Sequence, residues 1–122
     1  IRDRSPSRGL GDVYKRQGYL FDGKATMVVG THTHVPTADH RIMEKGTAYQ
    51  TDIGMCGDYN SVIGMNKDNS LAKFLKNPAA KKHFPAIGEA TISGLLVVAN
   101  DKTGLANKVE PIIVGKLLEN RI

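Results

Sequence analysis

Short apolar runs separated by glycine, proline and asparagine set the hydrophobic pattern of this chain. Residues 25–29 form one such run, which predicts a strand buried on both faces. Residues 39–43 and 47–52 contain β-branched and aromatic side chains on either side of the turn-forming sequence Glu-Lys-Gly, so they predict a β-hairpin. The first half of the chain is therefore expected to be strand-rich.

The second half predicts one short helix and a second pair of strands. We expect the helix at residues 70–76, capped by Asp68 or Asn69. Residues 89–99 and 106–114 predict two strands joined by a polar turn. The combined pattern indicates an α/β fold, in which the strand at residues 25–29 is central and the late ribbon completes the same sheet.

Residues 1–17 differ from the rest of the chain. Residues 12–17, DVYKRQ, back-translate to a sequence that resembles the transposase end of a common sequencing-library adapter. We therefore interpret residues 1–17 as a translated adapter segment, expect it to be disordered, and treat residues 18–122 as the domain. A genuine disordered basic tail is the alternative, given the Arg, Ser, Gly and Pro content.

This division changes the interpretation of charge. The whole chain carries a net charge of +5, but residues 1–17 hold five basic and two acidic side chains, which leaves +2 for the rest. A nucleic-acid or anionic-membrane binder therefore has little support. No apolar run approaches the roughly 20 residues of a membrane span. The single cysteine, Cys56, excludes an intrachain disulfide and favours a reducing, cytoplasmic location.

Two histidines carry the most informative chemistry. His32 and His34 lie in the sequence GTHTHV, directly after the predicted strand at residues 25–29. Histidine is the commonest metal ligand, and sites in α/β proteins form where strands end. The alternative for this pair is a hydrogen-bonded loop without a metal.

The remaining candidates are weaker. Asp39 and Asp52 are candidates for positions near the histidine loop, and for both we expect turn and strand-end hydrogen bonds in place of a metal-ligand role. His40 and His83 belong to no motif and are expected at the surface.

Several ordered blocks in residues 18–122 resemble the C-terminal part of the YmdB-type metallophosphoesterases. These are bacterial dinuclear-metal phosphodiesterases with a calcineurin-like fold that act on cyclic nucleotides. The blocks are GTHTHV at residues 30–35, TAD at 37–39, GTAY at 46–49, TDIGM at 51–55, IGM at 63–65 and EATISG at 89–94.

The resemblance implies a fold, an activity and a site. The fold would be the C-terminal part of a calcineurin-like α/β sandwich. His32 and His34 would each ligate one of two divalent or transition metal ions, with iron or manganese expected, and a metal-bound hydroxide would attack a cyclic nucleotide. The other ligands and the general-acid histidine of the family lie upstream of the position of Gly18. The resemblance therefore covers about the last two-fifths of the enzyme, and the isolated chain is expected to be inactive.

One other class of protein stays open. Without the resemblance, residues 25–114 would describe a small, non-catalytic β-rich module that binds a metal or another ligand. The expected partner is a small phosphodiester for the enzyme, with neither a membrane nor a nucleic acid, and a homo-oligomer is left open.

Overall fold

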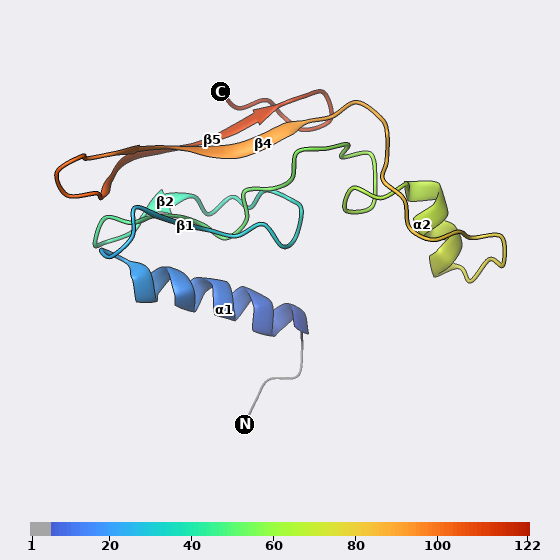
Figure 1. Ribbon diagram of the computed structural model, residues 1–122, viewed down its shortest axis with the longest axis horizontal. Helices are drawn as coiled ribbons and strands as arrows, with labels where there is room; N and C mark the ends of the chain where they lie inside the picture. Colours follow the sequence, from blue (N-terminus) through green and yellow to red (C-terminus); the bar gives the residue numbers. More distant parts are fainter. Residues whose placement is uncertain (1–5) are drawn as a thin grey trace.

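The computed structural model describes residues 6–122, with side chains from residue 12 onward. It combines helices and strands, so the α/β class is confirmed. Figure 1 shows a two-stranded ribbon, a small sheet and helix α1 stacked in layers, with α2 projecting to one side. The elements are α1 (Pro6–Phe21), β1 (Met27–Val29), β2 (Arg41–Ile42), β3 (Ala48–Gln50), α2 (Lys67–Phe74), β4 (Ile92–Ala99) and β5 (Ala106–Val114).

Strand β3 is the centre of the three-stranded sheet. It pairs in parallel with β1 and antiparallel with β2, and every one of its residues is buried. The predicted hairpin at residues 39–52 is therefore confirmed. Gly46, with φ of 102°, makes its turn, and the backbone of Met43 donates to the Thr47 carbonyl at 2.8 Å.

The predicted central position of residues 25–29 is wrong. Strand β1 covers only Met27–Val29 and lies at an edge of its sheet, with Met27 about half exposed. An apolar run predicts burial, but it does not say which neighbouring strand will be present to cover each edge. Within the part of the chain that the structure describes, β3 alone pairs with β1.

The late ribbon is confirmed as a strand pair but not as part of the same sheet. Strands β4 and β5 pair antiparallel along their length and form a separate layer over the first sheet. Three residues of the ribbon, Ser93, Ala106 and Ile113, are buried. The Ser93 hydroxyl donates to the Ile53 carbonyl at 2.7 Å, and the Ala106 backbone donates to the Gly46 carbonyl at 2.8 Å. Turn chemistry specifies a hairpin, whereas the sheet that the hairpin joins depends on packing between distant residues.

Helix α2 begins three residues earlier than predicted. Asn66 is its cap, and the Asn66 side chain accepts a hydrogen bond from the backbone of Asn69 at 3.0 Å. Asp68 instead lies in the first turn, where its charge complements the helix dipole. Within the described residues, no helix has both the length and the apolar character needed to cross a membrane.

The prediction of disorder for residues 1–17 is wrong for the part that the structure describes. Residues 6–17 belong to helix α1, while residues 1–5 lie outside the described residues. The helix ends at Phe21, where Asp22 and Gly23, the latter with φ of 83°, turn the chain toward β1. The polar composition of residues 6–17 gives no indication of a helix. The adapter origin of the segment stays a prediction.

Helix α1 contacts the sheet closely at Gly18. A Cβ atom at Gly18 would lie 2.6 Å from the ring of Tyr49, which is 1% exposed on β3. Glycine usually weakens a helix by about 1 kcal/mol relative to alanine. Here the absence of a side chain allows the helix to approach the buried ring.

We predict that Gly18→Ala destabilises the chain by about 1–3 kcal/mol, in spite of the higher helix propensity of alanine, because the new methyl group overlaps Tyr49. Urea denaturation monitored by circular dichroism measures the change. Gly94→Ala is the matched control, since nothing lies within 4 Å of the Cβ position there. Equal stability of the Gly18→Ala variant and the parent would contradict the packing of α1 on β3.

Candidate metal site

The histidine loop begins where β1 ends. Gly30 continues the pairing with the neighbouring strand, since its backbone nitrogen donates to the Gln50 carbonyl at 3.3 Å and its carbonyl accepts from Ile53 at 2.9 Å. A Cβ atom at Gly30 would lie 2.2 Å from the Thr51 carbonyl oxygen. Glycine at this position therefore lets the first residue of the loop lie against the end of β3.

His34 is held in a defined orientation. Its backbone has φ of 67°, in the left-handed region, and its Nδ1 lies 2.8 Å from the carbonyl oxygen of Ile63. A carbonyl oxygen only accepts hydrogen bonds, so Nδ1 carries the proton and the Nε2 lone pair is left for another partner. Metal-binding histidines commonly show this arrangement, in which the second ring nitrogen donates to a backbone carbonyl.

His32 lies on the exposed part of the same loop. Its ring is tilted by 53° against the ring of Tyr14, with 6.4 Å between the ring centroids. Tyr14 belongs to α1, so a residue of the segment set apart in the sequence contacts the candidate site. The contact brings the helix to the same end of the sheet as the two imidazoles.

Asp52 is hydrogen-bonded to the histidine loop. It is fully buried, and its carboxylate accepts hydrogen bonds from the backbone and hydroxyl of Thr33, at 2.6 and 2.7 Å, and from the backbone of Gly54 at 2.8 Å. Thr33 is the residue between the two histidines. The expected strand-end hydrogen bonding of Asp52 is thus confirmed, and its specific target was missed by the sequence analysis.

Asp39 has a similar role for the segment that follows the histidine loop. Its carboxylate accepts hydrogen bonds from the Thr37 hydroxyl at 2.6 Å and from the backbone of Thr51 at 3.1 Å, as well as from the Thr51 hydroxyl. Burial raises the pKa of Asp39, but these hydrogen bonds together outweigh it and hold the pKa below its ordinary value. Asp39 therefore stays ionised at neutral pH and ties the segment after the loop to the end of β3.

The donor set suits a transition metal but is incomplete within the described residues. Two imidazoles, one with its proton fixed on Nδ1, fit the ligand chemistry of such ions. A two-metal site needs several ligands for each ion. Among the described residues, no group of three or more His, Cys, Asp or Glu side chains could hold a metal ion.

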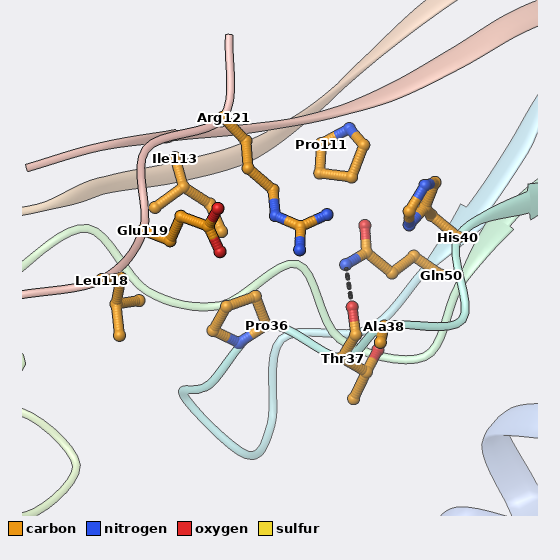
Figure 2. A pocket seen from close by; sticks show the side chains of 10 residues that line it. All are labelled: Pro36, Thr37, Ala38, His40, Gln50, Pro111, Ile113, Leu118, Glu119 and Arg121. Carbon is orange, nitrogen blue, oxygen red and sulfur yellow. Dashed lines mark hydrogen bonds between the residues drawn. The ribbon is translucent and has the colours of Figure 1, made fainter.

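A separate pocket of about 220 Å³ lies between the segment after the loop and the ribbon. Figure 2 shows Gln50 and Arg121 pointing toward one another in this pocket. The Gln50 amide donates to the Thr37 carbonyl at 2.8 Å, while its oxygen is buried without a hydrogen-bond partner among the described residues. Neither His32 nor His34 lines this pocket.

The other two histidines differ from one another. His83 is exposed, as expected. His40 is half-buried: its Nδ1 atom is buried and its ring lines the pocket, so the expected surface position holds only in part. The sequence contained no signal for this burial, which results from the ribbon folding over residues 36–40.

Comparison with known proteins identifies the family. The sequence pattern of the YmdB-like protein family matches residues 15–112, which include the histidine loop and most of the ribbon. The chain belongs to the YmdB-like family. The match begins inside the segment 1–17 that the sequence analysis sets apart.

A relative from Bacillus subtilis is named 2′,3′-cyclic-nucleotide 2′-phosphodiesterase. It is 44% identical over 98 residues, which cover 80% of this chain and 37% of the relative. This chain therefore spans less than two-fifths of that YmdB-like relative.

Two solved structures share the fold. A phosphatase from Mycoplasma pneumoniae superposes with a TM-score of 0.79 at 36% identity, covering 86% of this chain and 37% of the other. A hypothetical protein from Thermus thermophilus gives a TM-score of 0.78 at 35% identity, covering 87% and 41% of the two chains. The predicted resemblance and the fold of this YmdB-like chain are therefore confirmed.

We predict that Asp39→Asn lowers the free energy of unfolding at pH 7 by on the order of 1 kcal/mol, because an amide cannot accept all the hydrogen bonds of the carboxylate. The pKa of Asp39 is lowered by folding, so its contribution is complete above the ordinary Asp pKa of about 3.9. The difference between parent and variant should then shrink as the pH falls below that value.

Urea titrations at several pH values measure this difference. Asp101→Asn, at an exposed position in the turn of the ribbon, is the control. A difference between Asp39→Asn and the parent that stays constant down to about pH 2.5, below the ordinary Asp pKa, would show that the carboxylate charge contributes nothing.

Proposed function

We propose that this chain supplies the histidine loop of a dinuclear-metal phosphodiesterase that hydrolyses cyclic nucleotides. The observation that carries the proposal is the fixed His34 ring, whose Nδ1 donates to the Ile63 carbonyl and whose Nε2 is left for a metal. Membership of the YmdB-like family and the name of the Bacillus relative support the reaction and the substrate class.

His32 and His34 would each hold one ion, through Nε2 in the case of His34. When bound, the two ions would polarise the phosphoryl oxygens and provide a hydroxide nucleophile at neutral pH. Iron or manganese is the expected metal. The remaining ligands, and the acid that protonates the leaving oxygen, would come from residues outside this chain, since the chain spans 37% of the Bacillus relative.

The loop contributes orientation to this chemistry. The residues on both sides of His34 are hydrogen-bonded to Asp52, through Thr33 and Thr37, so the imidazole does not depend on a mobile segment. Ligands held by rigid elements bind an ion with a smaller loss of conformational entropy.

A cytoplasmic location, in keeping with the single cysteine, is part of the proposal.

A chimaera tests the proposal, with residues 18–122 replacing the aligned part of the Bacillus relative. We predict metal-dependent hydrolysis of 2′,3′-cyclic AMP by the chimaera and none by the 122-residue chain alone. His32→Ala or His34→Ala should lower the rate by about 100-fold or more and reduce the bound metal, since even residues that only support a ligand contribute about 10–100-fold. Rates and metal content are measured on the same preparations.

His83→Ala is the matched control, because this histidine is exposed and belongs to no motif. If both loop variants retain full metal content and rate, the ligand assignment is wrong. Turnover by the 122-residue chain alone would remove the need for residues outside it. Metal binding by the folded chimaera without turnover would instead favour a non-catalytic binding module.

A further inference from the structure

The buried carboxylate of Asp52 contacts the one residue that separates the two candidate ligands. A single oxygen of Asp52, Oδ2, accepts both the backbone N–H of Thr33 at 2.6 Å and its hydroxyl at 2.7 Å. The other oxygen, Oδ1, accepts the backbone N–H of Gly54 at 2.8 Å. Both carboxylate oxygens therefore act as acceptors.

The same residue also ties the other side of the loop through its backbone. The Thr37 backbone donates to the Asp52 carbonyl at 2.9 Å, and the Asp52 backbone donates to the Thr37 hydroxyl at 3.0 Å. His34, with its left-handed backbone, lies between these two attachments. Such a backbone conformation persists in a non-glycine residue only where the surroundings fix it.

Burying this carboxylate is costly. Asp52 is 0% exposed, and none of the ion pairs found among the described residues includes it. A buried charge without a paired cation is tolerated only when hydrogen bonds compensate for its lost hydration. Two of its three compensating donors belong to Thr33, an exposed residue of the loop. The carboxylate therefore constrains the loop as strongly as the loop stabilises the carboxylate.

We infer that Asp52 is the positioning residue of the histidine loop: acting through Thr33, it sets the relative placement of the His32 and His34 imidazoles before a metal ion binds. The inference rests on the proposed function, because it assigns the loop to a metal. We assign Asp52 no ligand role, because it is fully buried and its two carboxylate oxygens accept hydrogen bonds from Thr33 and from the backbone of Gly54. Thr33 transmits the constraint through the two peptide units that join it to His32 and His34.

Thr33→Val removes the hydroxyl of an exposed side chain of nearly the same shape, and with it the hydrogen bond to Asp52 and the contacts of this hydroxyl with the backbone of Val35. Asp52→Asn leaves the Val35 contacts in place, so the two variants together isolate the contribution of Asp52. Thr31→Val is the matched control, on the other side of His32, where the described residues offer the side chain no hydrogen-bond partner. Asp52→Asn tests the carboxylate, since an amide can accept from only one of the two sides.

The first measurement is calorimetric titration of the 122-residue chain with Zn²⁺ alone. Thr33→Val and Asp52→Asn should weaken Zn²⁺ binding by about tenfold. Thr31→Val should change it by less than about twofold. Equal Zn²⁺ affinities of the Thr33→Val variant and the parent would overturn the inference. If the His32→Ala and His34→Ala variants nevertheless failed to bind Zn²⁺, the proposed function would be unaffected by that result.

The second measurement needs no metal. Long-range ¹⁵N–¹H spectra of the histidine rings report which nitrogen carries the proton, and the parent should show His34 protonated at Nδ1. In the Thr33→Val and Asp52→Asn variants the two tautomers should become mixed, while Thr31→Val keeps the parent signal. An unchanged His34 signal in all variants would show that Asp52 only stabilises the fold, even if the parent itself failed to bind Zn²⁺.

Discussion

The complete burial of polar side chains around strand β3 is the constraint on which the rest of the structure depends. Thr47, Gln50 and Asp52 are each at most 1% exposed, and apart from the Gln50 amide oxygen their side-chain polar atoms are hydrogen-bonded within the protein. Thr47 donates to the Ala25 carbonyl at 2.6 Å and accepts from the Gly23 backbone at 2.8 Å. At the other end of the strand, Asp52 holds the loop that follows β1. The two ends of β3 thus determine where β1 begins and where it ends.

This arrangement explains why an exposed loop can have a defined conformation. The apolar core is small, and its buried hydrophobic members are Met43, Ala48, Tyr49, Ala106 and Ile113. Apolar packing alone therefore fixes few of the positions near the histidines. The hydrogen bonds of Asp39 and Asp52 fix the conformation of the loop instead, because a hydrogen bond, unlike an apolar contact, depends on angle as well as distance.

The histidine loop would need further ligands in a complete phosphodiesterase. His32 and His34 lie at the end of an edge strand, and the open edge of β1 faces away from β3. In the proposed enzyme, residues outside this chain would complete the ligand set. The Bacillus relative and the two superposed structures cover most of this chain, whereas the chain covers about two-fifths of each of those larger proteins.

The sequence by itself determined the local features of this protein. Turn residues and alternating side chains specified the hairpin around Gly46 and the β4–β5 ribbon, because these depend on neighbours along the chain. The GTHTHV block and its companions identified the family and the two candidate ligands. Tertiary structure alone decided that β1 is an edge strand, that helix α1 lies against Tyr49 at Gly18, and that Asp52 reaches Thr33. These features depend on contacts between residues far apart in sequence, and a pattern of polar and apolar positions does not specify which distant partner fills each contact.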